Sequence, residues 1–339
     1  MKAICINASS RRLEVLDLPA PDTPPPGHVI VDIEACGINH GDKLFLAMPG
    51  AAGGALNGSN RAWGVSAAGK VAAIGEGVPA SFLGKSVALY RSLDTSAWTV
   101  GVWSEKAQVS YTSCVVLPDH VPARDYCGSL VNAFTSYAFL EEIAAAGHRG
   151  VIATAGASAT ALALAALAKK RRVPVIHLVR SEAQYEEMRR LGLEHVITTD
   201  GEGFEDKLGQ AAETLGTTAV FDGLGGALIN RIAPHVPMNT SVYIYGTLDG
   251  SVPVTIPSRL FLSRNLAVRR FSNFNSATAK DPARLAAAMA DLRDVIADPL
   301  FRTSIGRAFR FEEIDAALAY RGASNARAVL VPPTAALKQ

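Results

Sequence analysis

Residues 150–181 are the stretch that most restricts how this chain can fold. An apolar run from Val151 to Ala155 leads into a cluster of small residues, then an Ala- and Leu-rich run, and then a second apolar run that ends near Ser181. This order predicts a strand, a tight turn, a helix and another strand, which together make one βαβ unit of a parallel sheet. Because Ala161 to Ala168 carries almost no polar side chain, we expect the helix to be buried on all sides.

The turn of this unit is a candidate dinucleotide site. Small residues let the backbone approach a ligand, and the start of the helix offers N–H groups to a phosphate. The G-x-G-x-x-G fingerprint is not met, because Gly156 is the only glycine and Ala159 and Ala161 stand where glycines are expected. Arg180 ends the second strand, where an acidic residue would bind a ribose 2′-hydroxyl; its donor fork suits a 2′-phosphate instead. The stretch therefore predicts an NADPH site, with a purely structural βαβ unit as the alternative.

Composition excludes several other classes of protein. The 339 residues suffice for two domains, and no run of eighteen apolar residues predicts a membrane span. The 33 basic and 31 acidic residues give a net charge of +2, too balanced for a general nucleic-acid binder. The N-terminus lacks the apolar core of a signal peptide. Four cysteines lie far apart without a C-x-x-C pair, which predicts reduced thiols in a cytoplasmic protein: Cys5, Cys36, Cys114 and Cys127.

Residues 1–125 predict a β-rich domain, and the region after them predicts an α/β domain with a doubly wound parallel sheet. Strands are expected first at Ala3 to Asn7, Leu13 to Leu18, Val29 to Cys36, Ala67 to Gly75, Ser86 to Tyr90, Trp103 to Val109 and Cys114 to Leu117. Helices are then expected at Ala133 to Ala145, Glu182 to Leu191, Phe204 to Leu215 and Leu228 to Val236, with strands at His195 to Thr199, Thr218 to Phe221 and Ser241 to Tyr245. The last part predicts a strand near Leu266 to Phe271, helices at Pro282 to Ala297 and Phe311 to Tyr320, and a strand at Ala328 to Pro332.

Two glycine-containing segments, Asp222 to Gly226 and Tyr245 to Leu248, each follow a predicted strand directly. In doubly wound sheets this is where ligands bind.

Motifs spread along the chain resemble those of one known family. They are Gly37-Ile-Asn-His-Gly-Asp42, Trp63-Gly-Val-Ser-Ala-Ala-Gly-Lys-Val71, Gly84-Lys-Ser-Val87, Val131-Asn-Ala-Phe-Thr-Ser136 and Leu191-Gly-Leu-Glu-His-Val-Ile197. In this order they resemble segments of the medium-chain dehydrogenase/reductase superfamily over nearly the whole chain. Within it, the chain resembles the zinc-independent quinone oxidoreductase and enoyl-thioester reductase branches.

The resemblance implies a GroES-like catalytic domain interrupted by a Rossmann domain. It places the first part of the catalytic domain at residues 1–125, the nucleotide-binding domain at 126–265 and the return to the catalytic domain at 266–339. It also implies a homodimer, and we expect the strand Ser241 to Tyr245 and the stretch Val252 to Ile256 to form the edge at which subunits pair.

The chain departs from the zinc-dependent members of the superfamily. They have a cysteine where this chain has Asn39, and a His-Glu pair where it has Val65 and Ser66. A catalytic zinc needs three protein ligands, so no metal is expected. His40, beside Asn39, is interpreted as a hydrogen-bonded structural or cleft residue.

Carried over residue by residue, the resemblance implies that NADPH is held by three groups of residues. Asn39, Asn132 and Thr135 would face the nicotinamide and its ribose, Ala157, Ser158, Ala159 and Thr160 the pyrophosphate, and Arg180 and Ser181 the 2′-phosphate. Tyr245, Gly246, Thr247 and Leu248 would line the ribose and nicotinamide side, with Phe271, Ser272 and Asn273 at the carboxamide and Arg327 in place of a family lysine. Simpler roles stay open: Asn39 and Thr135 as helix caps or local hydrogen-bonding residues, and Arg327 as a surface charge.

These features predict an NADPH-dependent, metal-free oxidoreductase that transfers hydride to a quinone, an enone or a similar small activated carbonyl compound. Related enoyl-thioester reductases use a tyrosine eleven residues after the family asparagine, where this chain has Gly50. The only candidates for a proton donor are His40, Asp42, Tyr90 and Tyr137, and solvent is the alternative. An enoyl-thioester reductase with a displaced donor, and a catalytically inactive nucleotide-binding redox sensor, remain as rival functions. The loops Leu46 to Asn60 and Ser92 to Val102 are expected to shape the substrate pocket.

Overall fold

The computed structural model describes residues 1–7, 10, 12–47, 62–93, 96–250, 252–322 and 326–336. The chain divides into two compact units, Met1–Phe134 with Asp281–Gln339, and Thr135–Lys280. These limits differ from the sequence-based ones at residues 125 and 265. The boundary between Phe134 and Thr135, which replaces the expected one at residue 125, lies inside the continuous helix α3, Ser129–Ala145. The boundary after Lys280 comes later than the expected one at residue 265. The reason is that the strand β13, Ala267–Arg270, pairs with β12, Ser241–Ile244, in the sheet of the second unit.

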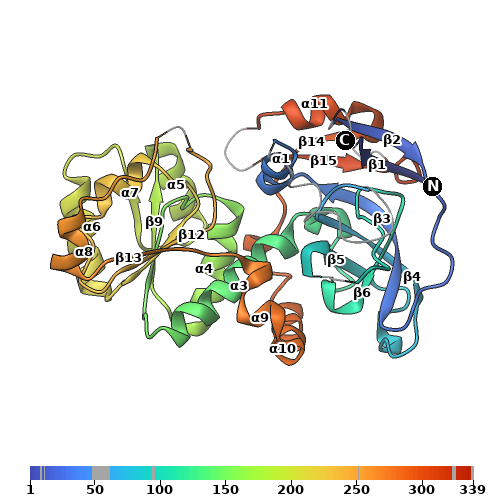
Figure 1. The fold of residues 1–339 in the computed structure, drawn as a ribbon, viewed down its shortest axis with the longest axis horizontal. Coiled ribbons are helices and arrows are strands. Elements are labelled where there is room, and N and C mark those ends of the chain that lie inside the picture. Colours follow the sequence, from blue (N-terminus) through green and yellow to red (C-terminus); the bar gives the residue numbers. More distant parts are fainter. Residues whose placement is uncertain are drawn as a thin grey trace. The chain divides into compact units, whose positions relative to one another are not determined.

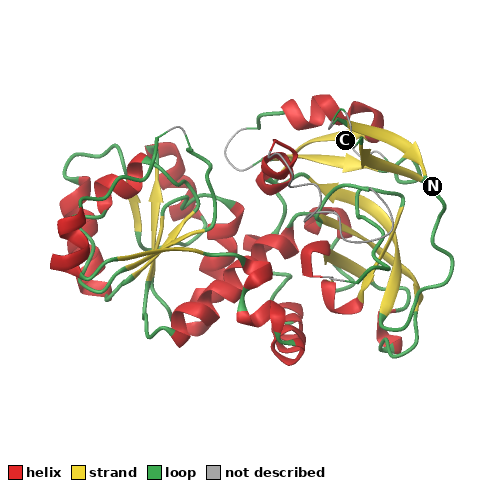
Figure 2. Cartoon of the chain, viewed as in Figure 1, coloured by secondary structure: helices red, strands yellow, loops and turns green. Residues whose placement is uncertain are grey.

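The second unit is built on a six-stranded parallel sheet in the order β10-β9-β8-β11-β12-β13. Its strands β9, β12 and β13 are labelled in Figure 1. Besides β12 and β13, the sheet contains β8 Val151–Ala153, β9 Val175–Val179, β10 Val196–Thr198 and β11 Ala219–Asp222. Its other helices are α4 Ala159–Arg171, α5 Glu182–Arg190, α6 Phe204–Leu215, α7 Ala227–Ile232, α8 Ser258–Arg264 and α9 Ala277–Lys280. Helices lie on both faces of the sheet (Figure 2), which confirms the predicted doubly wound fold.

Helix α4 is buried nearly all round, as its composition predicted. From Ala161 to Ala168 only Ala166 is not fully buried. The hydroxyl of Ser158 caps the helix by accepting a hydrogen bond from the N–H of Ala161. The core of this unit is formed by apolar side chains of the strands and of α6 and α7, among them Ile152, Leu178 and Phe204.

The first unit contains a seven-stranded sheet, in which β14-β15-β3-β4-β5-β7 follow one another and β6 pairs with β3. The strands are β3 His28–Gly37, β4 Ser66–Ile74, β5 Ser86–Tyr90, β6 Lys106–Ser110, β7 Cys114–Val116, β14 Ile305–Arg310 and β15 Arg327–Val331. The helices are α1 His40–Ala47, α10 Pro282–Arg293 and α11 Ile314–Ala319, together with the part of α3 up to Phe134. This sheet confirms the β-rich domain that the sequence predicted.

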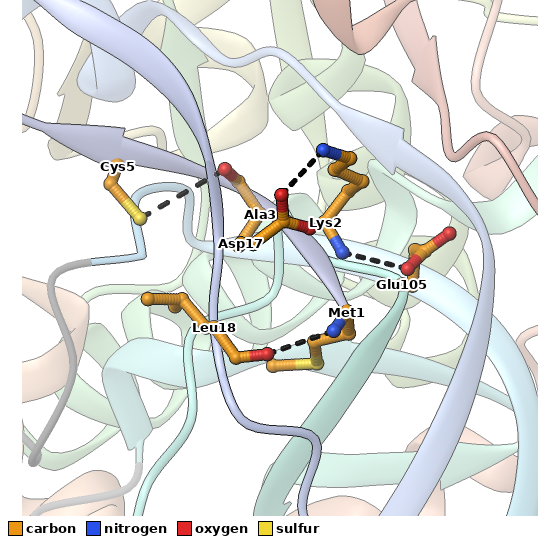
Figure 3. Close-up of polar contacts among 7 residues, drawn as sticks. All are labelled: Met1, Lys2, Ala3, Cys5, Asp17, Leu18 and Glu105. Atoms are coloured by element: carbon orange, nitrogen blue, oxygen red, sulfur yellow. Dashed lines mark hydrogen bonds and ion pairs between the residues drawn. The ribbon is translucent and has the colours of Figure 1, made fainter.

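A separate antiparallel pair, β1 Lys2–Ile6 and β2 Leu13–Asp17, begins the chain. Figure 3 shows how polar contacts hold it: the amino group of Met1 donates to the carbonyl of Leu18, and the backbone N–H of Lys2 donates to the carboxylate of Glu105. The ammonium of Lys2 pairs with Asp17 across the two strands at 2.7 Å.

One sequence-based expectation about the second sheet is wrong. We expected Ser241 to Tyr245 to form the edge of the sheet, but β12 lies between β11 and β13. On this side of the sheet the edge strand is β13, because residues Ala267–Arg270 add one more parallel strand beyond β12. Within the described ranges, no helix is both long and apolar enough to cross a membrane.

Candidate functional site

The order of the strands in the second unit fixes where a ligand can bind. The chain first lays down β8, moves outward through β9 and β10, and then returns to the other side of β8 with β11. In such sheets ligands bind outside the carboxyl ends of the strands, at the point where the direction of winding changes. Here that point lies between β8 and β11. The segments that follow these two strands are 154–158 and 223–226.

The turn after β8 packs against β9 so closely that only glycine fits at residue 156. A Cβ atom on Gly156 would lie 2.6 Å from the carbonyl oxygen of Leu178. The backbone N–H of Gly156 donates to that oxygen at 2.9 Å, and its own carbonyl bonds to Nδ1 of His177 at 3.0 Å. Burial lowers the pKa of His177 to about 4, so its ring is neutral at pH 7 and Nδ1–H donates. His177 is a positioning residue that sequence reasoning missed; its only signal was one polar residue inside an apolar strand.

The loop after β11 is organised by the buried carboxylate of Asp222. One of its oxygens accepts from the hydroxyl of Thr154 at 2.6 Å, and the other accepts from the N–H of Gly225 at 3.0 Å. Burial raises the pKa of Asp222, and these hydrogen bonds oppose that rise. Gly225 and Gly226 have φ values of +58° and +145°, which favour glycine. Asp222 therefore holds the loop across the carboxyl ends of β8 and β11.

The predicted segment Tyr245 to Leu248 is joined to that loop. Its backbone N–H groups at Tyr245 and Leu248 donate to the carbonyls of Asp222 and Gly223, each within about 3 Å. The ring of Tyr245 stacks on Phe221 with centroids 4.0 Å apart. A Cβ atom on Gly223 would lie 2.5 Å from the hydroxyl oxygen of Tyr245, so this glycine leaves room for the phenol.

Arg180 and Ser181 lie directly after β9, at the same edge of the sheet. The side chain of Arg180 is exposed, and its backbone N–H donates to Gln184. The hydroxyl of Ser181 caps α5 by accepting from the N–H of Gln184. An exposed guanidinium beside a helix start is suited to a phosphate group.

Thr135 and Asn273, both predicted to contact the nicotinamide side, contact each other. The amide of Asn273 donates to the hydroxyl of Thr135 at 2.5 Å, although 138 positions separate them. Phe271, just before, is buried and packs edge-on against Phe139 and Phe221. The bond ties the segment after β13 to α3, so Thr135 does more than cap its own helix.

A second polar cluster lies in the first unit around Asn39. The Asn39 amide donates to the hydroxyl of Ser66 at 2.7 Å, and its oxygen accepts from the guanidinium of Arg327 at 2.8 Å. The carboxylate of Asp42 accepts from the backbone N–H groups of Asn39 and Val65 at 2.8 and 3.2 Å. Positions 39 and 66, where the resemblance places zinc ligands in other members, thus carry an amide and a hydroxyl that bond to each other.

Burial sets the charges in this cluster. It raises the pKa of Asp42 to about 6, against the hydrogen bonds from Asn39 and Val65 and the charge of Arg327. Burial also lowers the pKa of Arg327, and the neighbouring carboxyl group of Asp42 opposes that shift. A Cβ atom on Gly128 would lie 3.0 Å from the guanidinium. Arg327 is therefore a packed member of the cluster, and the alternative of a surface charge is wrong.

The remaining candidates make other contacts. His40 is exposed at the start of α1, and Tyr90 is buried against Phe134. Tyr137 is buried under the guanidinium of Arg171. Arg171 is the last residue of α4, so Tyr137 lies at the opposite end of that helix from the turn after β8. The amide of Asn132 donates to the carbonyl of Gly128 at 2.6 Å within its own helix start. Gly50 and most of the loop expected at Leu46 to Asn60 lie outside the described residues, as do Asp94 and Thr95 of the second expected loop.

The second unit fits a dinucleotide better than either unit fits a metal ion. Its carboxyl edge combines a small-residue turn, a glycine loop and an exposed arginine. In the part of the chain that the structure describes, no three His, Cys, Asp or Glu side chains are placed to hold a metal ion.

Comparison with known proteins agrees with this architecture. The alcohol dehydrogenase GroES-like domain matches residues 25–119. A protein of Leishmania amazonensis named a probable quinone oxidoreductase is 26% identical over 272 residues, which cover 76% of this chain and 74% of the relative.

Two solved structures share the fold over nearly the whole chain. One is from Mesorhizobium loti and is named a "putative NADPH:quinone reductase". It has 23% identity and a TM-score of 0.74, and the match covers 97% of this chain and 94% of the other. A mycobacterial protein solved in complex with NADPH has 23% identity and a TM-score of 0.72, covering 98% and 100%.

Proposed function

We propose, from the medium-chain dehydrogenase/reductase fold and the GroES-like domain of this chain, that it is an NADPH-dependent oxidoreductase that works without a metal ion. The predicted resemblance to the quinone oxidoreductase-like branch of that superfamily is confirmed. The acceptor that we propose is a quinone, an enone or a similar activated carbonyl compound.

The observation that carries the proposal is the position of Arg180 relative to the turn after β8. Both lie at the carboxyl edge of one sheet, at neighbouring strands, with Arg180 exposed and its backbone tied to α5. We propose that Ala157 to Thr160 bind the pyrophosphate and that Arg180 and Ser181 bind a 2′-phosphate. Tyr245 to Leu248, Phe271 to Asn273 and Thr135 would line the remaining half of the cofactor.

The polar cluster of the first unit suits a supporting role. Asn39 is fixed by Ser66, Asp42 and Arg327, so its amide is held in one orientation. Bound NADPH would supply a hydride from nicotinamide C4, and the protein would supply orientation and exclusion of water. Quinone reduction needs little acid–base help, which agrees with the burial of Tyr90 and Tyr137.

The first test is a titration of the protein with NADPH and NADH, followed by nicotinamide fluorescence, with the variant Arg180→Ala beside it. We expect a preference for NADPH that Arg180→Ala removes. One charge-assisted hydrogen-bonding partner contributes about 1.5–3 kcal/mol, or roughly a 10- to 150-fold loss of affinity. Arg190→Ala is the matched control, because Arg190 is equally an exposed arginine but ends α5. If wild type binds neither cofactor, the proposal is wrong.

The acceptor is tested next by following NADPH oxidation with 1,4-benzoquinones, with α,β-unsaturated ketones and with a 2-enoyl thioester. Turnover of the first two classes alone supports the proposal. Turnover of the thioester alone would support an enoyl-thioester reductase, and binding without turnover would support a redox sensor.

We propose further that the protein is a cytoplasmic homodimer. The four cysteines are buried as thiols, which agrees with a reducing compartment. The edge strand β13 carries the exposed Val268, and the neighbouring helix α8 carries Leu262, which is 89% exposed. Light scattering at micromolar concentration tests the dimer, and a monomeric mass would remove it.

A further inference from the structure

Gln184 contacts both residues that would bind the 2′-phosphate. The backbone N–H of Arg180 donates to its side-chain oxygen at 3.0 Å, and its own backbone N–H donates to the hydroxyl of Ser181 at 3.4 Å. Gln184 is half-buried in the first turn of α5, whereas Arg180 and Ser181 are exposed. The two hydrogen bonds therefore join the segment after β9 to the first turn of α5 from both directions.

The backbone before Arg180 is fixed by the turn after β8. The carbonyl of Leu178 accepts from the N–H of Gly156 at 2.9 Å. Arg180 comes two residues later, and the bond from its N–H to Gln184 fixes where the chain leaves the sheet. Because a guanidinium binds a phosphate in a defined geometry, the position of the backbone that carries it matters.

Gln184 makes these contacts without a charge. It lies three residues after the cap residue Ser181, where a capping box has either a glutamate or a glutamine. A glutamate would be favoured by the helix dipole and could accept the same bond from Arg180. It would also place a negative charge against the backbone of Arg180, where a 2′-phosphate would be repelled. Glu182, the acidic residue of this turn, is exposed, so solvent and salt screen its charge.

We propose that Gln184 is the positioning residue of the 2′-phosphate site, and that its neutral amide sets the preference for NADPH by holding Arg180 and Ser181 in place without adding negative charge beside the phosphate. The inference rests on the proposed function of this site. Gln184 acts on NADPH through Arg180 and Ser181. NADH has no 2′-phosphate, so its binding should not depend on Gln184.

The test measures the dissociation constants of NADPH and NADH for wild type, Gln184→Ala and Gln184→Glu by calorimetry. Gln184→Ala releases the backbone of Arg180, and we expect NADPH binding to weaken by up to roughly 10-fold, the equivalent of one neutral hydrogen bond, with NADH binding unchanged. Gln184→Glu keeps the hydrogen bond but adds a charge, and we expect NADPH binding to weaken by roughly 3- to 10-fold. This second loss should shrink at high salt, because the repulsion is screened.

Three further measurements separate this effect from a loss of structure. Gln210→Glu makes the same charge change at an exposed position of α6, so its affinities should match wild type. Thermal unfolding should show Gln184→Glu to be at least as stable as wild type, because a carboxylate in the first turn of a helix is stabilising. Adenosine 2′-monophosphate carries the 2′-phosphate without the nicotinamide, so it should lose affinity in both Gln184 variants.

The outcomes separate this inference from the proposed function. If either Gln184 variant keeps the wild-type ratio of NADPH to NADH affinity, the inference is wrong, whether both affinities are unchanged or both fall equally. If Arg180→Ala still removes the preference for NADPH in that case, the proposed function stands. If wild type shows no preference for NADPH, the assignment of the 2′-phosphate to Arg180 and Ser181 fails, and the inference fails with it.

Discussion

Arg327 donates a 2.8 Å hydrogen bond to the side-chain oxygen of Asn39, although 288 positions separate them in the chain. Through this bond the strand β15, near the C-terminal end, fixes the residue that precedes α1. Asp42 and Ser66 hold the same amide from its other sides. Arg327, where the family resemblance implies a lysine, is thus a member of this cluster.

Replacing Arg327 by alanine should destabilise the first unit. The change leaves the oxygen of Asn39 without its charged donor and Asp42 without the nearby positive charge, so we expect a loss of about 2–3 kcal/mol. Urea unfolding at pH 7 measures it. Arg12→Ala is the control, because Arg12 pairs with Asp315 at 3.5 Å with both side chains about three-quarters exposed, and such pairs contribute about 0–1 kcal/mol. Equal losses in both variants would contradict a special role for Arg327.

Asp42 should make the protein more stable as the pH falls. Its pKa is about 6 in the folded chain, against an ordinary value of 3.8. Between these two pH values the folded state binds a proton that the unfolded state does not, so stability rises by up to about 3 kcal/mol from pH 6 to pH 4. Because His177 titrates in the opposite sense over nearly the same range, the measurement of unfolding is a difference: between pH 6 and pH 4 wild type should gain up to about 3 kcal/mol of stability relative to Asp42→Asn. Asp315→Asn, at an exposed site, should keep the wild-type slope.

His177 should act in the opposite direction. Burial lowers its pKa from 6.5 to about 4. The folded chain keeps His177 neutral down to about pH 4, whereas the unfolded chain binds a proton below about pH 6.5, so about 3 kcal/mol of stability is lost as the pH falls from 6.5 toward 4. His177→Gln keeps a donor for the carbonyl of Gly156 but cannot titrate. Its stability should fall less than that of wild type between pH 6.5 and 4, and parallel curves would show that His177 is not the titrating group.

Gly156→Ala should weaken both the fold and the site. The added Cβ atom would lie 2.6 Å from the carbonyl of Leu178, so the turn must move away from β9. Overpacking of this kind costs about 1–3 kcal/mol, and we expect a lower melting temperature with weaker NADPH binding. Gly41→Ala is the control, because its Cβ atom would meet only Phe45 at 3.8 Å inside α1. A Gly156→Ala protein with wild-type stability and affinity would show that the turn tolerates a side chain.

Sequence patterns predicted the elements with strong periodicity and missed those without it. Helix α6 was expected at Phe204 to Leu215 and is found there. Strand β14 was missed because Gly306, Arg307 and Arg310 interrupt any apolar alternation in it. The edge of the parallel sheet was misplaced because strand order depends on tertiary pairing, which periodicity does not report.

In the candidate site, too, sequence patterns indicated the features with a local signal and missed the contacts between distant residues. Small residues after a strand indicated the turn after β8, because that signal is local, but Ala159 and Thr160, expected in the turn, begin helix α4. The partnership of Thr135 with Asn273, and of Asn39 with Arg327, joins residues 138 and 288 positions apart, so no local pattern could indicate it. The assignment of these residues to NADPH stays a prediction.

The two units differ in how the chain supplies them, and this has a consequence for synthesis. The second unit is one continuous segment, Thr135–Lys280, whereas the first is assembled from both ends of the chain. During translation from the N-terminus, the parallel sheet can form as soon as β13 has left the ribosome. In the first unit β3 to β7 can pair early, but the sheet is complete only when β14 and β15 have been made, since β3 pairs with β15 through Cys36 and Gly37. Until then the edge of β3 and the amide of Asn39 stay without these partners, so a stalled or truncated chain would expose a strand edge that is open to aggregation.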